Sequence, residues 1–160
     1  MALMHGKLGR IEWDAAAVRT QLTLAQSWSC DVSQDIAEIT AMGDTWKTYL
    51  GGYSDWTATC ECLLDTAGPI ITPYGQGDPN GFADTEAYLE LYLKYDATNT
   101  AWRMVFGKAI CNGIAIGVDK DSVATVTYSF QGVDMLAWDA EDAALHSYAK
   151  LILRRRFYVY

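Results

Sequence analysis

The sequence predicts an all-β protein with minor α content, folded as a β-sandwich or barrel of six to eight strands. Segments in which apolar and polar residues alternate with a period of two recur along the chain, as in half-buried strands. The 160 residues include six Trp and ten Tyr among many Thr and Val, with thirteen Gly and only three Pro. Such residues favour strands. Because 51% of the residues are apolar, one ordinary domain core can form.

The first strands are expected over residues 9–14 and 18–32. Even positions of the second segment are largely apolar, as at Leu22 and Trp28, whereas its odd positions are polar or small. This alternation predicts one long half-buried strand. A short helix over residues 12–19 is the competing interpretation of the junction.

Residues 33–54 break the alternation. The segment mixes acidic and aromatic side chains and contains Gly51-Gly52, which we interpret as a turn. We therefore predict a long excursion from the sheet. Connections of this length are uncommon unless they have a function.

Alternation returns after residue 54. In residues 55–65, Thr57, Thr59 and Glu61 share the face opposite to Ala58, Cys60, Cys62 and Leu64. Further strands are expected over residues 87–95, 102–110, 111–118 and 122–130, with a tight turn at Asn112-Gly113 and a turn at residues 119–121. Residues 66–81 contain all three prolines and predict a loop, followed by a helical turn at residues 82–86. In residues 87–95 the pattern places Leu89 and Leu91 inward and Glu90 and Tyr92 outward. In residues 122–130 it places Ala124, Val126, Tyr128 and Phe130 inward.

The end of the chain has a different pattern. Asp139 is a candidate helix cap, and Leu145, Tyr148 and Ile152 follow at helical spacing. We expect a β-domain over residues 1–138 and a flanking helix with a basic, aromatic tail over residues 139–160.

The charge distribution excludes nucleic-acid binding by the main part of the chain, residues 11–149. The formal net charge is −8, and residues 11–149 hold all 20 acidic residues but only six of the 12 basic ones. Such a body repels phosphate. We expect no membrane association, because the chain has no run of about 18 apolar residues. The first ten residues also lack an apolar run of signal-peptide length.

No pattern of residues indicates catalysis. The chain has no nucleophile elbow, no His-Glu-x-x-His and no P-loop, so we expect neither an enzyme nor a cofactor. Cys60-x-Cys62 has no second cysteine pair at metal-ligand spacing. We interpret these thiols as small buried hydrophobes rather than as a metal site or a disulfide.

Several motifs, in their order, resemble the tail tube (major tail) proteins of long-tailed bacteriophages. They are Ser27-Trp28-Ser29, the stretch Thr40-Ala41-Met42-Gly43-Asp44-Thr45-Trp46-Lys47, the return Gly52-Tyr53-Ser54-Asp55-Trp56, and the late Val118-Asp119 turn before a strand that ends at Gly132. The resemblance covers about residues 6–136 and does not extend to the segment from Asp139 onward.

The resemblance implies a structural virion protein. Six subunits would close into a ring, and rings would stack, through a long loop, into a tube that conducts DNA into the host. The partners it implies are further copies of the chain, a tape-measure protein, a tail terminator and tail-tip proteins, with DNA in transit. The protein would be assembled in the host cytoplasm and reside in the virion tail.

The candidate contact residues follow from this resemblance and from the charge pattern. Those expected at the ring-to-ring interface are Asp35, Glu38, Asp44, Trp46, Lys47 and Tyr49, against an ordinary surface loop held by Trp46 as the alternative. Those expected to line the lumen are Thr57, Thr59, Glu61 and Glu90, against an outer, solvated face as the alternative. A C-terminal contact is expected from Arg154, Arg155 and Arg156, against a helix end whose arginines extend into solvent as the alternative.

Two other functions remain open from the sequence. One is a monomeric β-sandwich or barrel that binds a small ligand or a carbohydrate in an aromatic pocket. The other is a different ring component, such as a tail terminator or a secretion-system tube protein.

Overall fold

The computed structural model describes residues 9–15, 18–22, 24–66, 68–71, 86–94 and 103–139. Eight strands account for most of them. The strands are β1 (Arg10–Ala15), β2 (Val18–Gln21), β3 (Ala25–Glu38), β4 (Tyr49–Leu63), β5 (Glu86–Lys94), β6 (Arg103–Gly117), β7 (Thr125–Gly132) and β8 (Ala137–Asp139). Among the described residues, no helix has the length and apolar character needed to cross a membrane.

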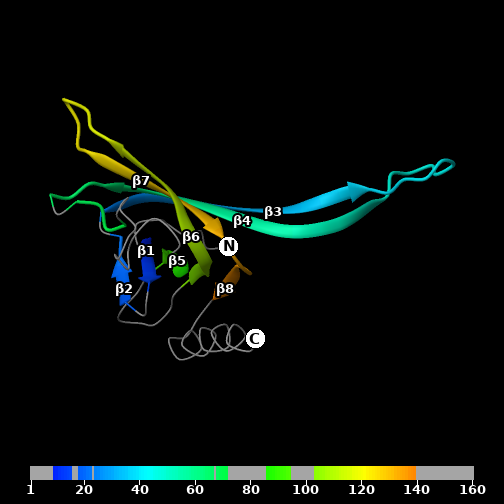
Figure 1. The fold of residues 1–160 in the computed structure, drawn as a ribbon, viewed down its shortest axis with the longest axis horizontal. Helices are drawn as coiled ribbons and strands as arrows, with labels where there is room; N and C mark the ends of the chain where they lie inside the picture. Colours follow the sequence, from blue (N-terminus) through cyan, green and yellow to red (C-terminus); the bar gives the residue numbers. More distant parts are fainter. Residues whose placement is uncertain are drawn as a thin grey trace, which may run out of the picture.

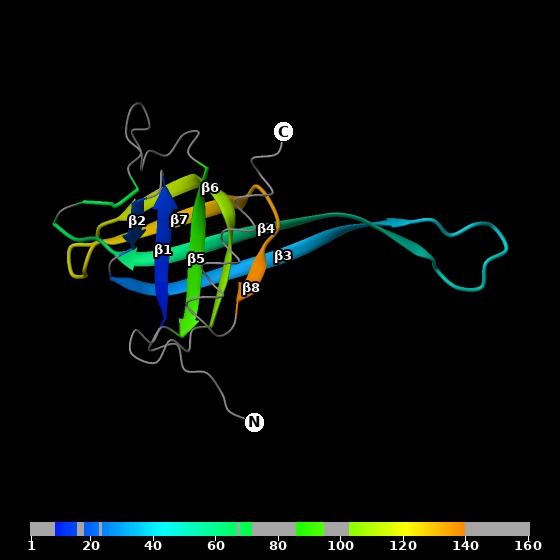
Figure 2. The ribbon, with the colours of Figure 1, turned by 90° about the horizontal axis from the view of Figure 1, so that it is seen from below.

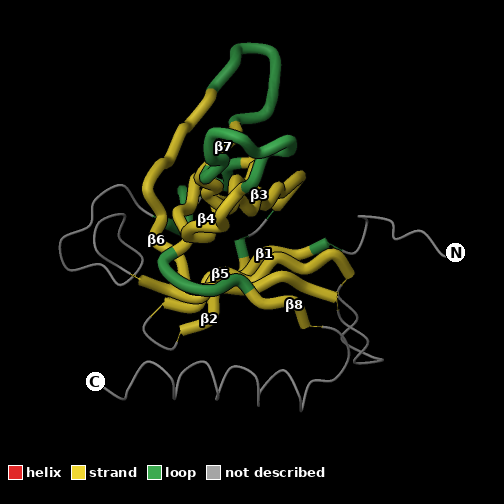
Figure 3. Tube along the Cα trace, turned by 90° about the vertical axis from the view of Figure 1, so that its right-hand side faces the viewer, coloured by secondary structure: helices red, strands yellow, loops and turns green. Residues whose placement is uncertain are grey.

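All eight strands belong to one antiparallel sheet. The strand order is β2-β1-β5-β6-β7-β4-β3, and β8 pairs with β6. The sheet curls into two layers, with β1, β2 and β5 in one layer and β3, β4 and β7 in the other (Figure 3). Strand β6 is 15 residues long and takes part in both layers. The all-β prediction is confirmed, but the sheet is not closed into a barrel, because β2 and β3 do not pair with each other.

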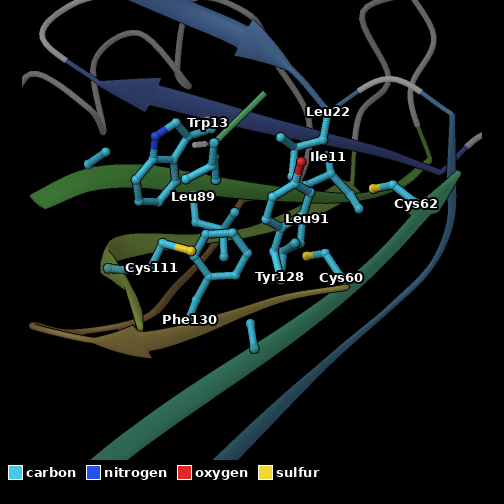
Figure 4. Close-up of a cluster of buried hydrophobic side chains, with 14 of the residues drawn as sticks. Ile11, Trp13, Leu22, Cys60, Cys62, Leu89, Leu91, Cys111, Tyr128 and Phe130 are labelled. Atoms are coloured by element: carbon cyan, nitrogen blue, oxygen red, sulfur yellow. The ribbon is translucent and has the colours of Figure 1, made fainter. Parts of the chain in front are cut away.

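The core lies between the two layers (Figure 4). Trp13 from β1 packs on Phe130 from β7 with ring centroids 5.2 Å apart, while Leu89 and Leu91 of β5 are 1% exposed. Cys60 of β4 is fully buried in the same cluster. The alternation predicted for β4, β5 and β7 thus places the expected apolar residues inside.

Residues of β5 that were expected to point into solvent are buried. Glu90 and Tyr92 are both 0% exposed, and the Tyr92 hydroxyl donates a 2.7 Å hydrogen bond to Oε2 of Glu90. The outward placement of Glu90 is therefore wrong. The prediction failed because both faces of this strand are covered, whereas a period of two was interpreted as one buried face and one solvated face.

Two predicted strand boundaries are also wrong. The strand expected over residues 18–32 is divided into β2 and β3 near Leu24, whose φ of 58° is left-handed and interrupts extended backbone. Conversely, β6 runs through Asn112-Gly113, where a register shift between Cys111 and Gly113 marks a bulge instead of a turn. The competing helix over residues 12–19 is not formed, because the described part of this segment lies in β1 and β2.

Residues 33–54 do not leave the sheet as a loop. Strands β3 and β4 continue past the body as a two-stranded hairpin that extends far to one side (Figures 1 and 2). Only residues 39–48 connect the two strands. Gly51 and Gly52 lie within β4 opposite a second bulge, between Gln34 and Ile36, so the turn predicted there is wrong.

Some predictions fall outside the described residues. These are the helical turn at residues 82–86 and most of the loop at residues 66–81. The segment 139–160, including Arg154, Arg155 and Arg156, lies outside as well, apart from Asp139 at the end of β8.

Candidate assembly surfaces

The hairpin of residues 33–55, here called the arm, contains all six residues predicted for ring stacking. Asp35 and Glu38 lie on β3, Tyr49 begins β4, and the other three lie in the connecting segment. Every one of the six is exposed. The structure therefore brings these residues together on one projecting element, while their contacts with another subunit stay a prediction.

The end of the arm is held by local hydrogen bonds. The Ala41 amide donates to Oδ2 of Asp44 over 2.8 Å, and the Thr48 amide donates to Oγ1 of Thr40 over 3.0 Å. Lys47 forms a 3.0 Å ion pair with Glu38. The two amide bonds satisfy polar backbone groups and fix the loop, so Asp44 and Thr40 have structural roles within the arm itself.

Large apolar side chains along the arm are left in water. They are Ile36, Ile39, Met42, Trp46, Tyr49, Leu50 and Tyr53, each between 51% and 105% exposed. A two-stranded hairpin without a third layer has only marginal stability in water. So many exposed large apolar side chains on one element are typical of a site of protein association.

Trp56 fixes the base of the arm to the body. Its indole Nε1 donates a 2.6 Å hydrogen bond to the carbonyl oxygen of Asp134. The ring lies against the backbones of Gly107 and Gly132, where a Cβ at Gly107 would come within 2.6 Å of the ring and one at Gly132 would overlap it. Nε2 of Gln131 donates to Oδ1 of Asp55 over 2.7 Å beside this contact. The two sequence motifs, one ending at Trp56 and the other at Gly132, thus pack against each other at their last residues.

A second surface covers the outer side of the layer that contains β3, β4 and β7. The register aligns Ser29 with Thr59 and Ser129, and it aligns Ser27 with Glu61 and Thr127. We call this surface the hydroxyl face. Its members are Ser27, Ser29, Asp31, Thr57, Thr59, Glu61, Thr125, Thr127 and Ser129.

The hydroxyl face carries short polar side chains and two carboxylates. The β3 and β4 members are exposed, and Oγ of Ser27 donates to Oε2 of Glu61 over 3.3 Å. None of the described residues of β3, β4 and β7 is Lys or Arg. The face can therefore hydrogen-bond water but has no cation with which to hold a phosphate.

Three of the four residues predicted for the lumen share the hydroxyl face. Thr57, Thr59 and Glu61 lie on it, whereas the buried Glu90 lies in the opposite layer. Sequence reasoning did not select Ser27 and Ser29. Their alternation within residues 18–32 was visible, but the strand pairing that sets them beside Thr59 and Glu61 was not.

The cysteines belong to the core. Burial raises the pKa of the Cys60 thiol, and it raises the pKa values of Cys62 and Cys111 to about 11. Burial also raises the pKa of Tyr128 to about 12, although its hydroxyl accepts a 3.1 Å hydrogen bond from the Ile70 amide. In the described part of the chain, no group of three or more His, Cys, Asp or Glu residues is placed to hold a metal ion. Thiols that stay protonated near neutral pH are weak nucleophiles and weak ligands.

Comparison with known proteins gives similarity in structure alone. No protein-family model and no curated protein matches the chain by sequence. A chain of the SPP1 tail tube aligns with a TM-score of 0.67 and 9% identity, over 89% of this chain and 83% of that chain. A chain of the gene transfer agent tail, solved with C6 symmetry, aligns with a TM-score of 0.62 and 10% identity, over 86% of this chain and 100% of that chain.

A contractile injection system provides a third similar structure. A chain of the PVC sheath–tube complex aligns with a TM-score of 0.60 and 15% identity, over 82% of this chain and 88% of that chain. The three matches span nearly the whole sheet in each case. The chain has the fold found in tail tubes and contractile injection systems.

Proposed function

We propose that this protein is the structural subunit of a virion tail tube, in which six copies close into a ring and rings stack through the arm. The observation that carries the proposal is the shared fold with a chain of the SPP1 tail tube and a chain of a C6-symmetric tail. Rings arise when identical subunits meet head to tail around a closed rotation. The neighbours are structural proteins of tubes, which supports a structural rather than a catalytic role.

The arm supports assembly on physical grounds. It exposes a row of apolar side chains on a hairpin that has no covering layer. Burying such surface between subunits releases about 25 cal/mol per Å² of apolar area. Trp46 and Tyr49 are the two aromatic residues among the six that are predicted to contact a neighbouring ring. Contact between neighbouring rings therefore supplies the burial that the isolated arm lacks.

The hydroxyl face is the proposed wall of the lumen. Thr57, Thr59 and Glu61 would face DNA in transit together with the aligned serines of β3. A wall without cations makes no lasting contact with phosphate, and its carboxylates repel the duplex. DNA would then pass without specific binding.

The remaining partners are those that the resemblance to tail tube proteins implies. A tube of defined length needs a tape-measure protein inside it, a terminator at one end and tip proteins at the other. The protein would assemble in the host cytoplasm and reside in the virion tail. The C-terminal arginines Arg154, Arg155 and Arg156 are proposed as an additional contact with such a neighbour.

The packing of the core argues against the alternative of a ligand-binding module. That function needs aromatic side chains around a closed cavity. In the described residues, Trp13 and Tyr128 instead pack on Phe130, with their ring centroids 5.2 and 6.4 Å from that of Phe130.

Electron microscopy of the concentrated protein tests the proposed function. We expect six-fold rings or tubes from the full chain. A variant in which Asn-Gly replaces residues 39–48 should remain folded and should not form tubes. Glu38 pairs directly with Tyr49, so a two-residue turn closes this hairpin.

Circular dichroism and tryptophan fluorescence would verify that the shortened variant keeps the fold of the body. Single subunits as the sole species of the full chain, at every concentration reached, would overturn the proposal. Tubes formed equally well by the shortened variant would remove residues 39–48, the tip of the arm, from the stacking contact.

A further inference from the structure

An apolar groove lies on the body where the arm begins. It has a volume of about 590 Å³, and Val32, Trp56, Val133, Met135 and Leu136 supply its apolar lining. Val32 is 63% and Met135 56% exposed, so the groove leaves apolar surface in contact with water. The carboxylates of Asp55 and Asp134 lie at the same groove. Such a concave apolar site with a few polar groups suits an apolar side chain from another molecule.

The tip of the arm presents side chains that suit this groove. Met42 is 105% exposed and Trp46 is 84% exposed, the highest values for large apolar side chains apart from Tyr53 among the described residues. The hydrogen bonds of Ala41 and Thr48 hold the surrounding backbone in place. A loop that is already ordered loses little conformational entropy on docking. Rigid aromatic anchors of this type contribute most of the energy in many interfaces.

The lengths of the two parts of β4 indicate that the tip which reaches the groove belongs to a second copy of the chain. The strand has seven residues in the arm, Tyr49 to Asp55, and eight in the body, Trp56 to Leu63. At about 3.3 Å per residue these stretches span roughly 23 and 26 Å. The arm extends away from its own body, so its tip is far from its own groove (Figure 2). In a head-to-tail stack with a repeat of about one body length, an arm of this length ends near the base of the next arm.

One cation at the tip of the arm can reach the carboxylates at the groove of a neighbour. Lys47 is the single cation among residues 25–63, and it lies one residue from Trp46. Its ion pair with Glu38 is at the surface, with the lysine side chain 66% exposed. An exposed pair of this kind contributes at most about 1 kcal/mol. Lys47 can therefore turn toward Asp55 or Asp134 of a neighbour at little cost.

We propose that Met42 and Trp46 of one copy occupy the groove formed by Val32, Trp56, Val133, Met135 and Leu136 of another copy. This contact rests on the proposed function and specifies its stacking site. It is heterologous, because tip and groove are different surfaces, and it repeats along the assembly. The groove is incomplete without the arm of a neighbour.

Cross-linking with paired cysteines tests the contact. In assembled protein that carries M42C and M135C, a short bis-maleimide should join successive copies and give a ladder of covalent multimers on a denaturing gel. M42C alone and M135C alone should give no ladder. M42C paired with T127C, on the hydroxyl face, is the matched control and should also give none. The native thiols interfere little, because three are buried and Cys30 is half-buried.

A second pair of variants separates docking from folding. M135D places a charge in the groove and should raise the concentration needed for assembly by about tenfold or more, since an unpaired carboxylate in an apolar site costs over about 1.4 kcal/mol. M135L keeps the apolar volume and should assemble within about twofold of the native chain. Met135 is exposed, so neither substitution should disturb the core. Circular dichroism should therefore show that both variants are folded.

The outcomes distinguish this inference from the proposed function. Tubes by electron microscopy without a ladder from M42C with M135C would overturn the groove contact and leave the tube function standing. A ladder of equal strength from the T127C control would also overturn it. Absence of any assembly by the native chain would contradict both the groove contact and the proposed tube function.

Discussion

At the scale of single residues, the contact of Trp56 with two glycines joins the arm to the body. The indole lies where the side chains of Gly107 and Gly132 would otherwise be, and its Nε1 is bonded to the Asp134 carbonyl. The sequence showed Trp56 and Gly132 as separate motif residues. It did not show that they meet, because 76 positions separate them and only the pairing of β4 with β7 brings them together.

Substitution of Gly132 tests this contact. We expect G132A to lower the free energy of unfolding by about 1–3 kcal/mol, because the new methyl group overlaps the indole and overpacks the site. G117A is the matched control, since its Cβ would meet only Oγ1 of Thr125 at 3.1 Å. Urea unfolding monitored by tryptophan fluorescence measures both. Equal stability of the two variants would contradict the role of Gly132.

The buried thiols predict a dependence of stability on pH. The pKa values of Cys62 and Cys111 rise from 9.0 to about 11 on folding, so the folded state holds these protons more tightly than the unfolded state. Their contribution is complete below about pH 9 and is lost as the pH rises toward 11. The free energy of unfolding should fall over this window.

Replacement of both thiols provides the comparison. C62A with C111A should show a smaller decline between pH 9 and 11, measured by urea unfolding at each pH. An identical slope in the native chain and the double variant would show that other groups cause the decline. Slow alkylation of the native thiols at pH 8 should accompany the result, because little thiolate is present.

At the scale of elements, the arm shows where sequence patterns mislead. Residues 33–54 lack clear alternation because both faces of the hairpin carry apolar and polar side chains, with a bulge between Gln34 and Ile36 that shifts the register. A strand with no buried face has no reason to alternate. The six residues predicted there nevertheless lie together on the arm, because all of them fall within residues 35–49 of one hairpin.

Hydrogen exchange tests the state of the arm before and after assembly. Amides of residues 33–55 should exchange quickly in the isolated subunit, because two strands without a covering layer open locally at low cost. The same amides should be protected in tubes. Amides of β7 serve as the internal control and should be protected in both states. Unchanged exchange of the arm on assembly would contradict its role in the interface.

At the scale of the whole molecule, the fold class was predictable and its topology was not. Alternation identified β5 and β7 and the buried residues Leu89, Leu91 and Phe130. It could not show that β6 continues through Asn112-Gly113, or that Glu90 is covered on what was taken as a solvated face. The continuation of β6 and the burial of Glu90 depend on which strands lie side by side. The period of the hydrophobic pattern does not contain that information.

The hydroxyl face provides a prediction at this scale. T59K with T127K introduces two cations on aligned strands of the proposed lumen wall. We expect these tubes to form but to retain DNA that the native tubes release, with retention that falls as salt rises, because cations hold phosphate. T59S with T127S is the matched control and should behave as the native chain. Binding of a labelled duplex to assembled tubes, measured at two salt concentrations, provides the readout.

The seating of Trp56 determines how a pull on the arm would travel through the molecule. Tension along β3 and β4 reaches the body at the indole, which bears on the backbones of Gly107 in β6 and Gly132 in β7. The load is thereby divided among several strands that run beside one another, and the ladder bonds between β4 and β7 resist it in shear instead of opening one at a time. A pull on the arm is therefore expected to load β4, β6 and β7 together and not one strand alone.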